Sequence, residues 1–192
     1  MMKFYCILCM LYSLQFIACK NNSSKESTPS ADSVAVFPYK EIIESDIKDV
    51  KDIPYYIYKI TEVNHLKKDS AQISLEDFLK LSKVFVEQTI TTEQLKKNYK
   101  ESTFHDLSTK NISITYTAID KSLPLQNVII LLKDNNNKLS HLYMDIFHSN
   151  NDTLIIQRNN WNMNTSFELN TLIKADNFEE QKTIKVVWNN KK

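Results

Sequence analysis

The chain of 192 residues contains no glycine, and this restricts both its turns and its chemistry. Glycine-rich phosphate loops, the dinucleotide-binding fingerprint and the G-x-S-x-G nucleophile elbow all need glycine where the backbone turns sharply or approaches a ligand. These kinds of site are therefore excluded. Turns that require a positive φ must use asparagine or aspartate instead. We expect such turns, with a structural role, at Asp134–Asn137 and Ser149–Asp152.

The first part of the folded chain predicts helices. Pro38 can open a helix, the apolar residues of Tyr39–Ile53 recur on one face at helical spacing, and Pro54 ends this segment. Ser74 begins a second helix with a spacing that resembles a capping box, and Thr91 caps a third. These local signals predict three helices before the strands begin.

The second part of the chain changes to a period of two, which is typical of half-buried strands. Before it, Tyr56–Ile60 predicts a short strand, although a helical turn also fits, and Lys67–Ser70 predicts a loop. Helices followed by strands indicate an α+β fold, with N-terminal helices packed on a curved antiparallel meander sheet. The sheet is predicted to have about six strands, over residues 111–118, 125–132, 139–147, 153–158, 166–173 and 183–188.

One predicted strand differs from the others because Val128–Leu132 is apolar at every position. A strand that is apolar on both faces is typical of the middle of a sheet that is covered on each side. We therefore expect this strand to be central, in a strongly curved sheet or half-barrel. Such curvature normally uses glycine at bulges, so this chain must curve its sheet with other residues.

The start of the chain resembles a bacterial lipoprotein signal. Lys3 precedes an apolar run that extends to Ala18, and a run of about fifteen residues is too short to span a membrane as a helix, which needs ~20. The run ends in Phe16–Cys19, which has the pattern of a lipobox. We expect residues 1–18 to be a signal peptide and Cys19 to receive lipid such as palmitate. The alternative is an ordinary cleaved signal in which Cys19 stands by chance.

This signal gives the expected organisation and location. Residues 19–36 form a polar, flexible tether, and residues 37–192 form a single domain. Cys6 and Cys9 leave with the signal, so the mature chain holds a single cysteine and cannot form a misplaced disulfide. We expect a monomer that is anchored in the outer membrane and faces the periplasm, because the early tether lacks the acidic residues of surface-exported lipoproteins.

Composition excludes several classes of function. The chain has 24 Lys and Arg against 23 Asp and Glu, whereas nucleic-acid binding needs a strongly basic field. Arg158 is the single arginine, so a dedicated bidentate clamp for anions is not expected. Outside the predicted signal peptide, the sequence has no H-E-x-x-H motif, cysteine pair or calcium-binding loop. We therefore predict no metal, no other cofactor and no enzymatic activity.

Two segments with histidine are the nearest to a catalytic arrangement. His105 and Asp106 are adjacent, and we interpret them as a turn between the last helix and the first strand of the meander. His141, Tyr143 and Asp145 share one face of a single strand. They are able to line a pocket, but a solvated outer face is the favoured interpretation, because the alternate residues of the strand make a good core face.

Trp161 is the third candidate contact residue, after His141 and Tyr143. It ends a predicted strand in the polar setting Asn159–Asn162, for which partial exposure is one interpretation. An exposed tryptophan on a tethered domain marks a contact with a partner or a ligand. Packing within a turn is the favoured alternative.

The order of helices and strands, with the endings Phe104–Asp106 and Lys185–Asn189, resembles uncharacterised small envelope lipoproteins of Bacteroidota. The resemblance covers Ile53 to Asn189, and it implies an envelope location without a known activity. Bacteroidota O-glycosylate exported proteins at Asp, then Ser or Thr, then a small apolar residue. This pattern occurs at three positions, which are Ser33, Ser70 and Thr153.

Two functions of different classes follow. The first is a protein-interaction module, in which a sheet edge or an exposed aromatic residue docks an envelope protein. The alternative is a carrier or sensor of a small apolar ligand or lipid, which needs an enclosed pocket with an apolar lining. The interaction module is favoured, because most apolar residues of a domain of this size are needed to close its core. The sequence does not distinguish a purely structural or immunity-type lipoprotein from the module.

Overall fold

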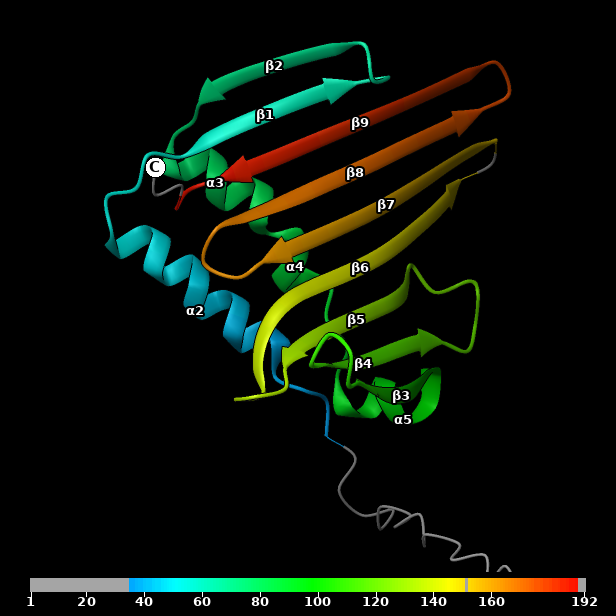
Figure 1. The fold of residues 1–192 in the computed structure, drawn as a ribbon. Coiled ribbons are helices and arrows are strands. Elements are labelled where there is room, and N and C mark those ends of the chain that lie inside the picture. Colours follow the sequence, from blue (N-terminus) through cyan, green and yellow to red (C-terminus); the bar gives the residue numbers. More distant parts are fainter. Residues whose placement is uncertain (1–34, 151, 190–192) are drawn as a thin grey trace, which may run out of the picture. The chain divides into compact units, whose positions relative to one another are not determined.

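The computed structural model describes residues 35–150 and 152–189. In this part of the chain one helix and a hairpin are followed by three short helices and a run of seven strands (Figure 1). The α+β class predicted from the sequence is confirmed. The elements are α2 (Tyr39–Asp52), β1 (Tyr58–Val63), β2 (Lys67–Gln72), α3 (Leu75–Ser82), α4 (Val84–Glu87), α5 (Thr92–Asn98), β3 (Tyr99–Asp106), β4 (Asn111–Ala118), β5 (Leu125–Lys133), β6 (Lys138–Asn150), β7 (Thr153–Asn162), β8 (Ser166–Ala175) and β9 (Phe178–Val187).

The strands form one antiparallel sheet of 9 strands in the order β2-β1-β9-β8-β7-β6-β5-β4-β3. Strands β3 to β9 are a meander, since each pairs with the next along the chain. The hairpin β1–β2 extends the sheet beyond β9, because β1 pairs with β9. The two edges of the sheet are therefore β2 and β3.

The prediction of about six strands was wrong, because neither edge strand, β2 or β3, was recognised from the sequence. Lys67–Ser70 lies within β2 and is not a loop. His105 and Asp106 end β3 and do not form the predicted turn. Edge strands bury little surface, so they do not need the apolar alternation that reveals a strand. Most side chains of β3 are indeed exposed.

The helix starts were predicted correctly, because their signals are local. The Ser74 hydroxyl accepts a hydrogen bond from the Asp77 amide at 3.1 Å and caps α3. Thr91 and Gln94 form a reciprocal capping box at the start of α5. Helix α2 ends at Asp52, and its C-cap Ile53 lies directly before Pro54, as the sequence predicts.

Five aromatic residues fill the space between the helices and the sheet. The Trp161 ring lies 5.1 Å from the Phe167 ring and 5.1 Å from the Phe85 ring, measured between centroids. Phe78 packs edge-on against Trp188 at 5.3 Å. Phe78 and Phe85 come from α3 and α4, so this aromatic layer joins the helices to the sheet.

Of the two interpretations of Trp161, partial exposure was wrong, since its side chain is 0% exposed. The indole Nε1 donates to the Asp46 carboxylate of α2 at 2.8 Å. The indole N–H is the one polar group of a tryptophan side chain, so a single hydrogen-bond acceptor satisfies it when the ring is buried. The polar sequence around Trp161 is explained by the strand itself, in which alternate residues face the opposite side of the sheet.

The sheet has one covered face, which we call the inner face, and one outer face. Val128, Ile130 and Leu132 are buried on the inner face. Ile129 and Leu131 point to the outer face and are half-buried. Within residues 35–150 and 152–189 no helix packs on the outer face, so the expectation of a central strand covered on both sides was wrong.

The sheet curves without glycine. The pairing of β5 with β6 shifts register between Leu125 and Asn127 and again between Leu131 and Leu132. Such irregularities bend a strand and increase its twist. Figure 1 shows β6 curving strongly near its start, beside the end of β5.

The turns use residues other than glycine at positive φ. Asn64, Asn137 and Asn164 adopt φ of 51°, 53° and 62°, and Asn137 lies in a cluster where such a turn was predicted. His65 and Lys110 also have positive φ, at 58° and 54°. No sequence signal predicted these two, because histidine and lysine have little intrinsic preference for this region.

Lys110→Gly is expected to stabilise the domain by about 0.5 kcal/mol. A left-handed conformation costs an L-residue ~1–2 kcal/mol, and glycine removes this cost while adding a smaller entropic cost of ~0.4–1 kcal/mol in the unfolded chain. Urea unfolding of both proteins measures the difference. Lys121→Gly is the control, because Lys121 is exposed in a loop and lacks a positive φ. Equal destabilisation by both substitutions would contradict the argument.

Candidate binding surface

A row of polar side chains crosses the outer face of the sheet. The register pairs Asn127 with Asp145, Asp145 with Arg158, Arg158 with Asn170, and Asn170 with Thr183. These five residues come from the consecutive strands β5 to β9, and we call them the outer-face row. Because directly paired residues point to the same face, their side chains lie side by side.

The hydrogen bonds within the outer-face row leave its arginine free. Asn127 Nδ2 donates to Asp145 Oδ2 at 3.2 Å, and Thr183 Oγ1 donates to Asn170 Oδ1 at 2.7 Å. Among the described residues the Arg158 guanidinium makes no ion pair and no side-chain hydrogen bond, although Asp145 lies directly opposite. The donors of Arg158 therefore face solvent.

Two shallow pockets lie on either side of Arg158. One has a volume of about 210 Å³ and is lined by Asp145, Tyr143 and Ile129 among others. The other has a volume of about 190 Å³ and includes Ile156 and Leu172. Arg158 and Asn170 line both pockets, so the outer-face row runs between them.

An aromatic pair borders the row. The rings of His141 and Tyr143 stack with centroids 6.2 Å apart and an angle of 11° between their planes. Tyr143 is 39% exposed. The pKa of His141 is lowered by partial burial and, to a smaller extent, by the charge of Lys133, so the ring is favoured in its neutral form. His141, Tyr143 and Asp145 thus share the outer face, as predicted, and Tyr143 and Asp145 also line a pocket there.

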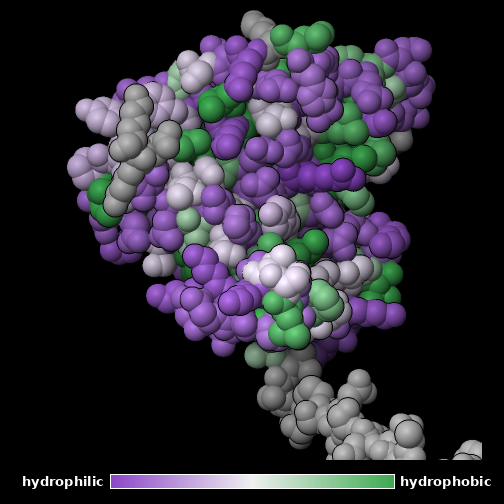
Figure 2. All heavy atoms as spheres, in the orientation of Figure 1, coloured by the Kyte–Doolittle hydropathy of each residue, from purple (hydrophilic) through white to green (hydrophobic). Residues whose placement is uncertain are grey.

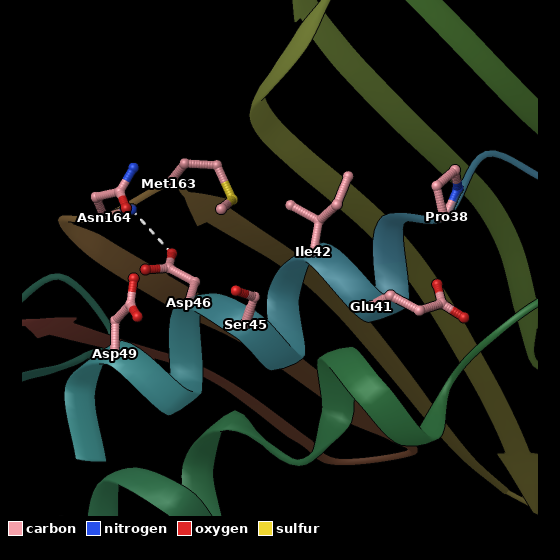
Figure 3. A pocket seen from close by; sticks show the side chains of 8 residues that line it. All are labelled: Pro38, Glu41, Ile42, Ser45, Asp46, Asp49, Met163 and Asn164. Atoms are coloured by element: carbon pink, nitrogen blue, oxygen red, sulfur yellow. Dashed lines mark hydrogen bonds between the residues drawn. The ribbon is translucent and has the colours of Figure 1, made fainter. Parts of the chain in front are cut away.

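A third pocket, larger than these two, lies between α2 and the turn that joins β7 to β8 (Figure 3). It has a volume of about 330 Å³ and is lined by Glu41, Asp46, Asp49 and Asn164 among others. Asp46 Oδ2 accepts from Trp161 Nε1 and from the Asn164 amide, each at 2.8 Å. Burial raises the pKa of Asp46, and these two hydrogen bonds partly oppose the shift. Asp46 is thus used by the fold, and the pocket beside it is an open groove.

The remaining predicted sites are placed as follows. Cys19 and Ser33 lie outside the described residues. Ser70 is exposed on β2, which is a strand and not the flexible segment expected there. Thr153 is half-buried at the first position of β7. O-glycosylation at these three hydroxyl residues stays a prediction.

His105 and Asp106 do not converge, and each has its own structural partner. His105 Nε2 contacts Asp134 Oδ1 at 3.0 Å. Asp106 accepts from the hydroxyl and amide of Ser108 and of Thr109, which lowers its pKa to about 2. Both residues therefore organise turns at one end of the sheet.

The outer-face row was missed by sequence reasoning, which set Arg158 aside as the single arginine. The signal was present, because polar residues occupy the outward positions of several consecutive strands. What was absent was the register, without which Asp145, Arg158 and Asn170 have no known relation to one another.

The buried Asp46 predicts a specific pH dependence. Ionisation of Asp46 is disfavoured in the folded state, so its contribution to stability is complete below the ordinary carboxyl pKa of ~4 and is lost as the pH rises through the raised value. Asp46→Asn keeps an acceptor for both donors and cannot ionise. The stability of wild type minus that of Asp46→Asn is expected to fall as the pH rises, as measured by urea unfolding at a series of pH values.

Asp46→Ala serves as the comparison for this experiment. It leaves Trp161 Nε1 without its acceptor and is expected to cost about 1–3 kcal/mol at every pH. A difference between wild type and Asp46→Asn that does not vary with pH would show that the carboxyl does not titrate in the folded state as described.

The described residues show no sign of a metal centre or a membrane span. Across residues 35–150 and 152–189, no group of three or more His, Cys, Asp or Glu side chains is arranged to hold a metal ion. Every helix in these ranges is too short or too polar to cross a bilayer.

Comparison of the chain with protein-family models, curated proteins and solved structures found no match. The surface geometry is therefore the basis on which a function is proposed.

Proposed function

We propose that this protein is a lipid-anchored protein of the bacterial envelope whose domain binds a protein partner through strand β3. The anchor rests on the lipobox at Cys19, and the envelope location follows from it. The partner site rests on one observation, which is that β3 is an open sheet edge beside exposed apolar side chains.

Strand β3 offers its free edge over 8 residues. It pairs with β4 on one side only, and it is the last strand of the sheet. The free side of an edge strand carries backbone N–H and C=O groups that a second strand can pair with. This geometry supports β-augmentation, in which an extended segment of the partner adds a tenth strand to the 9 of the sheet.

Apolar side chains beside this edge supply contact area. Phe104 is 67% exposed on β3, and Leu107, in the turn that follows, is 76% exposed. In Figure 2 hydrophobic residues are visible over the lower part of the domain, where Figure 1 draws β3, β4 and β5, and others lie at the upper right. Exposed apolar groups next to a free edge are typical of strand-addition sites.

The opposite edge is less suited to a partner. Strand β2 has 6 residues, whereas β3 has 8. Both edges carry neighbouring exposed charges, which are Lys68 and Asp69 on β2 and Lys100 and Glu101 on β3, so charge does not distinguish them. The greater length of β3 and the exposed Phe104 within it support β3 as the partner site.

The alternative, a carrier of an apolar ligand, has weaker support. The space between helices and sheet is filled by the aromatic layer, in which Phe78, Phe85, Phe167 and Trp161 are each at most 1% exposed. The pockets described above all open on the surface and have mixed polar linings. An enclosed apolar cavity is what a carrier needs.

Photocrosslinking in the native envelope tests the partner site. A photoreactive amino acid is introduced into the full-length chain at Lys100 or Ser102 of β3, and at Ser70 of β2 as the matched control, since all three side chains are exposed. Both β3 positions are expected to trap the same protein, because a strand added to this edge contacts them both, and Ser70 is expected to trap none. Phe104→Ser is expected to reduce the yield.

Two outcomes would contradict the proposal. Equal crosslinking from β2 and β3 would indicate non-specific contact. If no protein is crosslinked from β3, the proposed partner site at this edge is wrong. Native mass spectrometry of the purified mature protein separates the carrier alternative. A bound apolar ligand in addition to the N-terminal lipid would favour the carrier, and a mass without such a ligand would favour the interaction module.

Cys19→Ser tests the membrane anchor. Without the thiol no lipid can be attached, so the protein is expected to move from the membrane fraction to the soluble periplasmic fraction. Cys9→Ser is the control and is expected to leave the distribution unchanged. A Cys19→Ser protein that still sediments with membranes would overturn the anchor.

A further inference from the structure

We propose that the outer face of the sheet binds a neutral carbohydrate at the outer-face row, with Arg158 at the centre of the site. This site is separate from the β3 edge and does not depend on a protein partner there. The inference rests on four observations, which concern the position of the polar residues, the free arginine, the aromatic neighbour and the balance of charge.

The polar residues lie where a sheet alone would not favour them. Asn127, Asp145 and Asn170 are in the interior of their strands, and Asn and Asp are depleted in strands. Asn160, on the neighbouring row, is also in a strand interior and lines the same pocket as Asp145. The sheet therefore carries several amides and a carboxylate together at positions that cost it strand propensity.

Arg158 has hydrogen-bonding capacity that the fold leaves unused. Its guanidinium is planar and carries several N–H donors in a fixed fork. Asp145, its direct neighbour across β6 and β7, accepts instead from Asn127 at 3.2 Å. A ligand hydroxyl between Arg158 and Asp145 could accept from the guanidinium and donate to the carboxylate. Hydroxyl groups are suited to this position, because each is both a donor and an acceptor.

Tyr143 provides an apolar surface next to these polar groups. Its ring is 39% exposed and is held in place by stacking on His141. Ile129, its direct partner on β5, lines the same pocket. A sugar ring has hydroxyls around its edge and C–H groups on its faces. An aromatic ring beside planar polar side chains matches both parts of such a ligand.

The charge at the site favours a neutral ligand. Asp145 balances Arg158 within the outer-face row. In the next row Glu168 of β8 pairs in register with Lys185 of β9, which adds one charge of each sign. A polyanion such as a nucleic acid or a phosphorylated glycan would need an excess of positive charge. A neutral sugar is recognised by hydrogen bonds alone and requires none.

The size of the site fits a short ligand. The two pockets, of about 210 Å³ and about 190 Å³, meet along Arg158 and Asn170. Both are open depressions on the outer face of the sheet. This arrangement suits two sugar rings lying across the row, with one ring over each pocket.

The test is binding of the mature protein to a panel of neutral mono- and disaccharides of glucose, galactose, mannose and N-acetylglucosamine, with sulfated versions alongside. Amide NMR shifts report where each sugar binds. At least one neutral sugar is expected to bind with a Kd below about 10 mM and to shift the side-chain amides of Asn127 and Asn170. Arg158→Gln and Tyr143→Ala are each expected to weaken binding about tenfold or more.

Lys182→Gln is the matched control for Arg158→Gln. It also removes one exposed positive charge, but its register partners Thr171 and Val63 place it on the inner face of the sheet. It is expected to leave the affinity unchanged, and thermal unfolding checks that all variants remain folded.

Three outcomes would overturn the proposal. The first is that no neutral sugar binds at about 10 mM. The second is binding that is unchanged in both Arg158→Gln and Tyr143→Ala, since the site would then lie elsewhere. The third is binding confined to sulfated sugars and abolished by salt, which would make Arg158 part of an anion site. The crosslinking result at β3 bears on none of these outcomes.

Discussion

The contact of Asp46 with Trp161 is the interaction on which the arrangement of helices and sheet depends. One carboxylate oxygen accepts from the indole of β7 and from the Asn164 amide in the following turn, each at 2.8 Å. The contact fixes α2 against the end of the sheet and sets the orientation of the Trp161 ring. The same ring packs against Phe85 of α4 and Phe167 of β8. The Asp46–Trp161 hydrogen bond and the aromatic layer therefore hold each other in place. The low dielectric constant of the surrounding apolar side chains strengthens this hydrogen bond.

The two faces of the sheet have different roles as a consequence. The inner face is closed by large side chains, and the three pockets described above all open on the surface. Both proposed binding sites use surfaces that the fold leaves open, which are the β3 edge and the outer face. These surfaces differ in chemistry. The edge offers backbone groups and Phe104, whereas the outer face offers planar polar groups around Arg158. They suit a polypeptide and a carbohydrate, respectively.

Much of the fold was predictable because its signals are local. The caps at Ser74 and Thr91 and the break at Pro54 locate the helices, and alternation locates the inner strands of the meander. The edge strands β2 and β3 were not predictable from pattern, because an edge buries too little to need one. Trp161 was misjudged for a related reason. Its neighbours in sequence are polar, but its neighbours in space are aromatic, and its single polar atom is satisfied by a residue 115 positions away.

The sequence by itself determined the fold class, the absence of glycine-dependent sites, and the use of asparagine in turns such as that at Asn137. Each of these depends on residue type or on short-range spacing. Only the tertiary structure decided which strands lie at the edges, which residues stand opposite one another in the outer-face row, and that Arg158 is left without a partner. The physical reason is that register and strand order are set by packing of the whole inner face against the helices. A site made from five strands exists only once that packing has brought them together.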